Sequence, residues 1–176
     1  MLPASKGAGS FLFPDKMIKI RNAISQDQKT ITRLIRDAGI NPMSLDWHRF
    51  VIAEDNGQVH PERSRRIVGI GQIKPHGDGS RELASLAVIP ERQGQGIGGE
   101  IIRHLLEKES GVIYLTCRAQ LESYYTRFGF RKIGREEMTP YFRRIHRIGN
   151  IFARLAGTRL LVMKKEIDGR RTTEDE

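Results

Sequence analysis

Four glycines within six residues constrain the fold of this chain more than any other feature. They lie in Gln93–Gly99, after an apolar run that ends at Pro90 and before a segment with helical periodicity. Glycine adopts backbone conformations that other residues avoid, so this stretch predicts a sharp turn from a strand into a helix. The N–H groups at such a helix N-terminus, with the positive end of the helix dipole, favour phosphate groups. The stretch therefore predicts a site for a nucleotide-like cofactor.

Length and composition are typical of one soluble domain. The chain has 176 residues, 38% hydrophobic and 29% charged, which is enough to bury a core. We expect a flexible extension over residues 1–16, one domain over 17–167 and a disordered, charged tail over 168–176. The single cysteine, Cys117, favours a reducing compartment, and no apolar stretch approaches the roughly 20 residues that span a bilayer. We therefore expect a cytoplasmic monomer or homodimer without membrane contact.

Hydrophobic periodicity predicts strands and helices in a mixed order. The expected strands cover residues 17–23, 49–54, 66–74, 82–89, 112–116, 130–133 and 159–166. Helices are expected from a capping box at Ser25 and Gln28 to Gly39, from Ile97 towards Gly111, and over residues 119–128. Several strands in succession, followed by strand–helix–strand–helix–strand, indicate one mixed sheet flanked by helices.

Two other interpretations of the glycine stretch remain open at this point. Gly94, Gly96 and Gly99 also satisfy the dinucleotide fingerprint G-x-G-x-x-G. That fold needs its first glycine directly after the strand and an acidic residue about 20 positions on, and neither is present. Too little chain follows to build its alternating halves. A purely structural turn is the other alternative, although a turn alone needs fewer glycines.

A longer stretch resembles the signature of the GNAT superfamily of N-acetyltransferases. In that family a strand with Val-x-Pro leads through (Gln/Arg)-x-x-Gly-x-(Gly/Ala) into a helix, and Leu86–Gly98 follows this pattern. A second stretch, Tyr124–Phe130, resembles the family's aromatic–Tyr-x-x-x-Gly-Phe. The resemblance covers roughly Met17 to Lys165. It implies an α/β (α+β) fold of the acyl-CoA N-acyltransferase type, with a single mixed, mostly antiparallel sheet of six to seven strands.

The resemblance also implies acetyl-CoA as cosubstrate, with no metal. Its pyrophosphate would lie on the turn, and its pantetheine arm would bond to the fourth strand, which splays from the fifth in this family. The expected cofactor-binding residues are Leu86, Ala87, Val88, Gln93, Gly94, Gln95, Gly96, Ile97, Gly98 and Gly99.

Two side chains are candidates for proton transfer. Glu82 matches the general base of several GNAT lysine acetyltransferases, and strand alternation would place it on one face with Ala84, Leu86 and Val88. Tyr125 matches the family's general acid, which protonates the departing thiolate. The alternatives are that Glu82 ends a strand or pairs with Arg81, and that Tyr125 fills the core.

Other positions near these residues depart from the family or have plainer explanations. Thr116 occupies the position of a second family glutamate and cannot serve as a base. Arg118 and Leu121 replace the asparagine and alanine that are frequent in the family. Cys117 lies near the expected thioester, but we expect a small buried residue rather than an acyl carrier.

A basic segment follows the second motif, in a chain with a formal net charge of +9. Between Met138 and Lys165 there is no Asp or Glu, and arginines alternate with aromatic and aliphatic residues. The pattern is typical of an amphipathic helix or of a nucleic-acid-binding surface. We expect a wall of the acceptor site that favours acidic surroundings. The leading function is N-acetyl transfer to a primary amine of unknown identity, on a protein or a small molecule. The alternative is a basic nucleic-acid-binding or acyl-CoA-sensing protein without turnover.

Overall fold

A seven-stranded sheet, in the order β1-β2-β3-β4-β5-β7-β6, forms the centre of the molecule. The computed structural model describes residues 18–40, 45–55, 66–155 and 157–169. All neighbouring strands are antiparallel except β4 and β5, which are parallel. The mixed, mostly antiparallel sheet is therefore confirmed. The strands are β1 (Ile18–Asn22), β2 (Phe50–Asp55), β3 (Arg66–Pro75), β4 (Arg81–Val88), β5 (Gly111–Arg118), β6 (Arg131–Lys132) and β7 (Leu160–Ile167).

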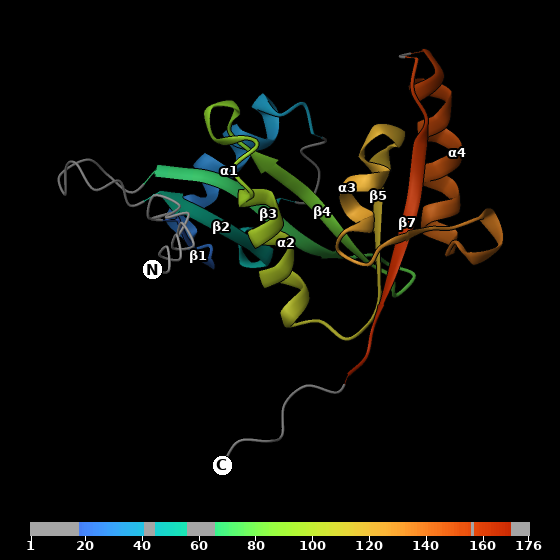
Figure 1. Cartoon of the computed structure of the whole chain (residues 1–176), viewed down its shortest axis with the longest axis horizontal. Coiled ribbons are helices and arrows are strands. Elements are labelled where there is room, and N and C mark those ends of the chain that lie inside the picture. Colours follow the sequence, from blue (N-terminus) through green and yellow to red (C-terminus); the bar gives the residue numbers. More distant parts are fainter. Residues whose placement is uncertain (1–17, 41–44, 56–65, 156, 170–176) are drawn as a thin grey trace, which may run out of the picture.

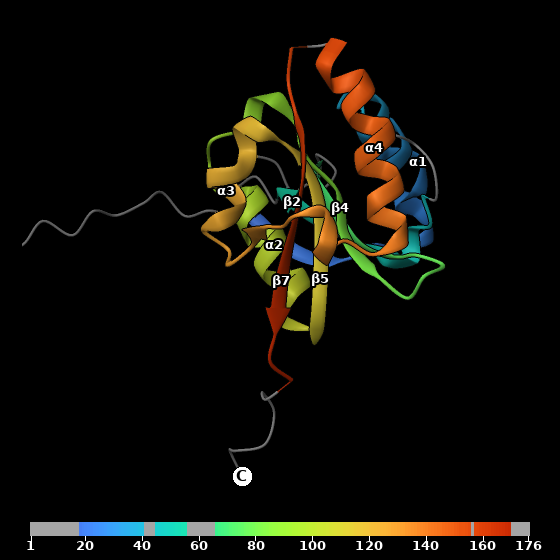
Figure 2. The ribbon, with the colours of Figure 1, turned by 90° about the vertical axis from the view of Figure 1, so that its right-hand side faces the viewer.

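Helices cover both faces of this sheet (Figures 1 and 2). Helices α1 (Gln28–Asp37) and α4 (Pro140–Leu155) lie on one face, and α2 (Ile97–Glu107) and α3 (Glu122–Thr126) lie on the other. The basic segment thus forms a long helix, as one of its two interpretations predicted. The helix expected over residues 119–128 is shorter, because its first turn is a 3₁₀ helix. The expected strand 130–133 is reduced to the two residues of β6.

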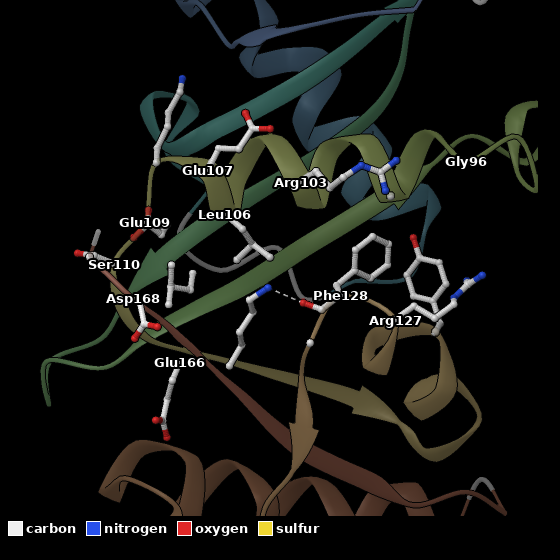
Figure 3. A pocket seen from close by; sticks show the side chains of 17 residues that line it. Gly96, Arg103, Leu106, Glu107, Glu109, Ser110, Arg127, Phe128, Glu166 and Asp168 are labelled. Atoms are coloured by element: carbon white, nitrogen blue, oxygen red, sulfur yellow. Dashed lines mark hydrogen bonds between the residues drawn. The ribbon is translucent and has the colours of Figure 1, made fainter. Parts of the chain in front are cut away.

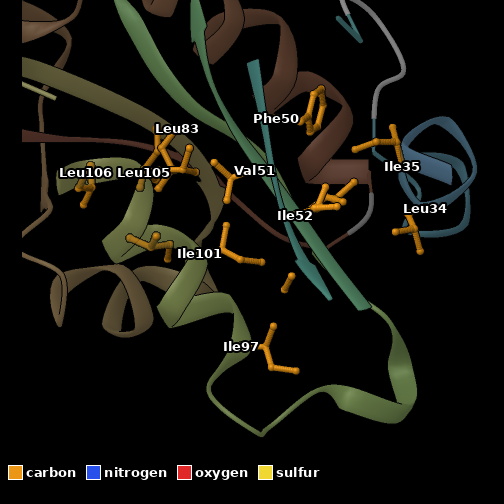
Figure 4. Packing of buried hydrophobic residues seen from close by; sticks show 14 of the residues in the cluster. Leu34, Ile35, Phe50, Val51, Ile52, Leu83, Ile97, Ile101, Leu105 and Leu106 are labelled. Atoms are coloured by element: carbon orange, nitrogen blue, oxygen red, sulfur yellow. The ribbon is translucent and has the colours of Figure 1, made fainter. Parts of the chain in front are cut away.

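Helix α2 packs on one face of the sheet, in the larger of two clusters of buried hydrophobic residues among the described residues. Ile101 and Leu105 of this helix are buried against the sheet at β3 (Figure 4). Two glycines of β3 let the helix approach closely: an added Cβ would lie 2.9 Å from Ile101 at Gly69 and 2.8 Å at Gly71. Burying an isoleucine side chain contributes about 1.5–3 kcal/mol, so this contact fixes where α2 begins relative to the sheet.

Strands β4 and β5 pair at one point, between the second residue of β4 and the fourth residue of β5. The register has a single pair of partners, Glu82 and Tyr114, although each strand is eight residues long. Beyond this pair the strands diverge, so the backbone of β4 towards Val88 is open on the side of β5. The splay expected from the resemblance is present.

A bulge in β4 changes which side chains share a face. Ala84 pairs with Gln72 and Ala87 with Ile70, so β4 has one more residue in this interval than β3, and Ser85 has a positive φ of 56°. The bulge reverses the alternation of the strand. The expected common face of Glu82, Ala84, Leu86 and Val88 is therefore wrong beyond Ala84. Leu86 and Val88 lie beside Gly98 of α2, whereas Glu82 and Ala84 lie on the face of α4.

The start of α1 also differs from the prediction. The cap lies one residue earlier than predicted: Asp27, rather than Gln28, reaches back, and its carboxylate accepts the backbone N–H of Ile24 at 2.8 Å. The side chain of Gln28 instead accepts the N–H of Trp47. The same Asp27 carboxylate pairs with Arg21, six positions earlier on β1.

The described residues include no helix that is long and apolar enough to cross a membrane. The expected extension over residues 1–16 lies outside the described residues. Of the expected tail, only Asp168 and Gly169 are described, directly after β7.

Candidate functional site

The glycine turn connects the open end of β4 to the N-terminus of α2. Gly94 and Gly96 have positive φ angles of 75° and 80°, which glycine adopts at no steric cost. The first residues of α2, from Ile97, have N–H groups without acceptors inside the helix. The side chain of Gln93 donates to the carbonyl of Val88 at 2.9 Å and so fastens the turn to the strand. This geometry fits the pyrophosphate that the sequence predicted.

The other two glycines of the run have a different role. A Cβ at Gly98 would lie 2.8 Å from the hydroxyl of Tyr124, and one at Gly99 would lie 3.2 Å from Phe128. Both aromatic residues belong to the second motif, so α2 and α3 meet at these glycines. Two of the four glycines thus serve helix packing, whereas the sequence interpretation had assigned the whole run to the cofactor.

An open groove runs between α2, α3 and β7 (Figure 3). Of the predicted cofactor residues, only Gly96 and Gly99 line it. Gln93, Gly94 and Gln95 belong to the turn beside it, Gly98 to the first turn of α2, and Leu86, Ala87 and Val88 to the adjoining end of β4. The side chain of Ile97 is buried against Gly69, so Ile97 can contribute only its backbone.

Three cationic side chains in this groove were missed by the sequence interpretation. Arg103 lies 5.9 Å from the ring centroid of Phe128, and Arg127 lies 5.0 Å from that of Tyr124. The ammonium of Lys165 donates to the carbonyl of Phe128 at 2.6 Å. The helices that hold both arginines were expected, but their orientation depends on packing. The lining of the groove as a whole is mixed, because it also holds Lys108 and the carboxylates of Glu107, Glu109, Glu166 and Asp168. The end near Gly96, where Arg103 and Arg127 lie, is the part that suits an anionic ligand (Figure 3).

The candidate base Glu82 has a partner that the sequence interpretation missed. Its Oε2 lies 2.9 Å from Nε2 of His76, and the side chains of Glu82 and His76 are only 13% and 5% exposed. The alternative pairing with Arg81 is wrong, because Arg81 pairs with Glu109. Tyr114, the register partner of Glu82, stacks on Phe142 of α4. Glu82 therefore lies on the α4 face of the opening between β4 and β5.

The candidate acid Tyr125 lies on the opposite face of the sheet. It belongs to α3, and its ring makes T-shaped contacts with the rings of Tyr124 and Phe130. Burial, then the neighbouring Cys117 and Tyr124, raise the pKa of Tyr125 above its ordinary value. The phenol therefore remains protonated at neutral pH and can donate a proton or a hydrogen bond. The structure does not bring Glu82 and Tyr125 into contact; it places them on the two sides of one gap.

Cys117 is buried, as expected, and the hydroxyl of its neighbour Thr116 is buried too. Cys117 is buried, and its thiol lies 3.9 Å from the sulfur of Met163. Burial, and then the charge of Glu122, raise the pKa of Cys117 to about 11, so the thiol is protonated and weakly reactive. The hydroxyl of Thr116 is buried, with no hydrogen-bond partner among the described residues. Neither side chain offers a base.

Helix α4 presents a basic outer surface. Arg144 and Arg147 are exposed, and Ile148 and Ile151 beside them are 45% and 61% exposed. Arg143 is turned away from this group, since it donates to the carbonyls of Arg135 and Glu136. The inner side of the helix holds Phe142, which is fully buried.

A GNAT acetyltransferase domain profile matches residues 46–132, which include β4, the glycine turn, α2 and the second motif. The chain belongs to the GNAT superfamily. No curated protein sequence matches it. The resemblance drawn from the two motifs is therefore confirmed.

Solved structures of this fold resemble the GNAT chain at low sequence identity. N-acetylglutamate synthase from Neisseria gonorrhoeae, in complex with coenzyme A and N-acetyl-glutamate, matches with a TM-score of 0.63 and 20% identity over 87% of this chain and 36% of that one. A Mycobacterium tuberculosis protein, in complex with CoA and NLQ, matches with a TM-score of 0.60 and 22% identity over 85% of this chain and 99% of that one. The ribosomal-protein-S18-alanine N-acetyltransferase from Escherichia coli matches with a TM-score of 0.56 and 16% identity over 91% of this chain and 100% of that one. The chain spans about a third of the length of the first of these structures.

Proposed function

We propose that this GNAT protein is an N-acetyltransferase that moves an acetyl group from acetyl-CoA to a primary amine by direct attack. The observation that carries the proposal is the opening between β4 and β5, which pair only at Glu82 and Tyr114. This opening adjoins the N-terminus of α2 and the end of the groove that holds Arg103 and Arg127. The two CoA-bound structures of the same fold support the choice of cofactor.

In this proposal the cofactor uses backbone groups more than side chains. The pyrophosphate accepts hydrogen bonds from the N–H groups at residues 94–99, where the helix dipole adds favourable charge. The pantetheine arm extends along Leu86, Ala87 and Val88 as an additional strand, as peptides do at sheet edges. Arg103, Arg127 and Lys165 supply positive charge to the remainder of the molecule.

The proposed reaction uses the two faces of the sheet. The amine loses its proton to Glu82, and its nitrogen attacks the thioester carbonyl. The C–S bond then breaks, and the thiolate takes a proton from Tyr125, whose phenolate is reprotonated through water by the second proton that the nitrogen loses. Deprotonating an alkyl ammonium such as lysine at pH 7 requires about 4–5 kcal/mol, so a positioned base is needed. The separate placement of Glu82 and Tyr125 supports this division, because the base acts on the nitrogen and the acid on the sulfur, two different substituents of the tetrahedral carbon.

The acceptor proposed here has acidic groups near its amine. Arg144 and Arg147 are exposed on α4, the helix that covers the face of the sheet carrying Glu82. In this proposal they contact the acidic groups of the acceptor. We place the reaction in a reducing compartment such as the cytoplasm, which suits the single cysteine. Binding to a nucleic acid is an outcome that the test below separates from this proposal.

A thiol-release assay with acetyl-CoA tests the proposal. Lysine peptides, N-terminal peptides, polyamines and aminoglycosides serve as acceptors, and calorimetry measures the binding of coenzyme A. Heat of binding and release of coenzyme A with at least one acceptor would support the proposal. Binding of coenzyme A without release, together with salt-dependent binding of oligonucleotides, would favour the sensing or nucleic-acid alternative. The absence of any coenzyme binding would reject the proposed cofactor.

A further inference from the structure

His76 is hydrogen-bonded to Glu82, and the catalytic motifs of the sequence do not include it. The hydrogen bond between Nε2 of His76 and Oε2 of Glu82 is 2.9 Å long. A carboxylate can only accept, so the histidine ring donates. With Oε2 held in this way, the direction of the second oxygen is fixed too, because both oxygens of a carboxylate lie in one plane.

The imidazole is itself held from three sides. It stacks on Tyr141 with ring centroids 3.5 Å apart and an angle of 18°, and it meets Phe142 edge-on at 5.7 Å. The backbone of His76 closes the hairpin between β3 and β4, since its N–H donates to Ser80 and its carbonyl accepts from Gly79. A ring fixed by stacking and by its own hairpin can hold a carboxylate in one orientation.

The first turn of α4 is tied to the same hairpin. The carboxylate of Asp78 accepts the backbone N–H of Tyr141 at 2.8 Å, although the two residues are 63 positions apart. Burial disfavours the charged form of Asp78, but hydrogen bonds from Ser80, Tyr141 and Thr139 outweigh it and hold the pKa of Asp78 well below its usual range. The hairpin tip and α4 therefore form one unit around the imidazole.

We propose that His76 is a positioning residue for the base: it orients the Glu82 carboxylate so that the free oxygen can accept the proton of the acceptor amine. The proposal rests on the proposed acetyltransferase function. It adds a residue that neither family motif contains, and it gives α4 a part in the reaction through the stacked ring of Tyr141.

Two substitutions separate the hydrogen bond from the ring stack. His76→Gln retains an N–H donor near the position of Nε2 and loses the aromatic ring. His76→Phe retains the stack on Tyr141 and loses the donor. We expect His76→Phe to lower kcat about tenfold, a part of the 10²–10⁴-fold effect of a general base, with KM for acetyl-CoA unchanged. His76→Gln should keep kcat within about threefold of the wild type, on the same scale. Equal losses in both variants, or no loss in either, would overturn the proposal.

A double-mutant cycle identifies the partner. In the Glu82→Gln background, His76→Phe should have no further effect on kcat, because the carboxylate it orients is gone. Independent effects that multiply in the double variant would contradict the assignment.

NMR provides a readout that does not depend on turnover. We expect the ring N–H of His76 to exchange slowly with water in the wild type and rapidly in Glu82→Ala, which has no side-chain acceptor. His48 is a matched control, because it also pairs with a carboxylate, Asp46, and stacks on Trp47, yet it is exposed. Its ring N–H should exchange rapidly in both proteins. A slow signal that persists in Glu82→Ala, or that is missing from the wild type, would overturn the pairing. A wild-type protein that binds no coenzyme and transfers no acetyl group would reject the proposed function, and the NMR signal alone then decides whether His76 holds Glu82.

Discussion

The cofactor side and the acceptor side of this GNAT protein are built in different ways. On the cofactor side, consecutive residues of one turn supply backbone N–H groups, and glycines make room for them. On the acceptor side, side chains from β3, β4 and α4 meet across long sequence separations, such as those of His76, Glu82 and Tyr141. The first kind of site is recognisable as a motif, whereas the second exists only after folding. Substitutions on the two sides should therefore change different kinetic constants.

The largest effect is expected on the acceptor side, at Glu82. Glu82→Gln should lower kcat by about 10²–10⁴-fold and move its pH profile towards higher pH, because solvent must then deprotonate the amine. Stopped-flow or steady-state thiol release at several pH values measures this change. A variant with wild-type kcat at neutral pH would remove Glu82 from the mechanism.

Tyr125→Phe should follow, with a loss of about 10²-fold in kcat and little change in the dissociation constant of acetyl-CoA. In the wild type, the alkaline limb of the kcat profile should lie above pH 10, because burial raises the pKa of Tyr125 and the protonated phenol persists to higher pH. Calorimetry provides the binding control. An equal loss of affinity and rate would instead indicate that Tyr125 only packs the core.

Gly98→Ala should act on the cofactor side. The new Cβ would lie 2.8 Å from the hydroxyl of Tyr124, so α3 must shift away from the turn. We expect affinity for acetyl-CoA to fall about tenfold, or about 1.4 kcal/mol, while kcat at saturation changes little. Adding Tyr124→Phe removes the clashing oxygen and should restore most of the affinity. No recovery in the double variant would mean that the cofactor itself needs the space at Gly98.

Charge reversal at Arg144 and Arg147 should have a smaller effect. Each change to Glu should raise the acceptor KM by a few-fold, roughly 1 kcal/mol for both together, with acetyl-CoA affinity unchanged. The control is Lys132→Glu, the same change of charge at exposed β6 on the edge of the sheet. Equal shifts in KM in both experiments would point to overall charge rather than to a local wall.

The smallest effect is expected at Cys117. Cys117→Ala should retain activity within about twofold and lower stability by about 1 kcal/mol, the range of a small buried truncation. Its thiol should react slowly with a disulfide reagent at pH 8, because burial raises the pKa of Cys117 to about 11. Loss of turnover with normal folding, measured by circular dichroism, would revive a covalent intermediate.

Much of the fold could be predicted from the sequence. The apolar runs located the strands, and the glycine turn located the N-terminus of α2, because both signals are carried by neighbouring residues. The bulge at Ser85 could not be predicted, since a positive φ at serine depends on pairing with β3. That one residue reversed the face assigned to Leu86 and Val88.

The candidate site divides in the same way. Glu82 and Tyr125 could be proposed from the sequence because Glu82 lies at a fixed distance from the first motif and Tyr125 lies within the second. His76 was not, because a histidine in a turn has many plainer roles until its partner is known. The orientation of Arg103 towards the groove depends on how α2 packs on the β3 glycines, which periodicity does not specify.

The bond from Asp78 to the backbone of Tyr141 has a consequence for the order of assembly. A chain emerging from the ribosome presents the hairpin tip about sixty residues before the turn of helix that it caps, and a lone helix of this length is marginal in water. Strands β1 to β4 and α2 have their mutual contacts before α4 is made, whereas β5 and β6 gain their partner β7 only after it. Nascent protein should therefore form the glycine turn and the hairpin tip first, and α4 should then fold against a template that is already in place.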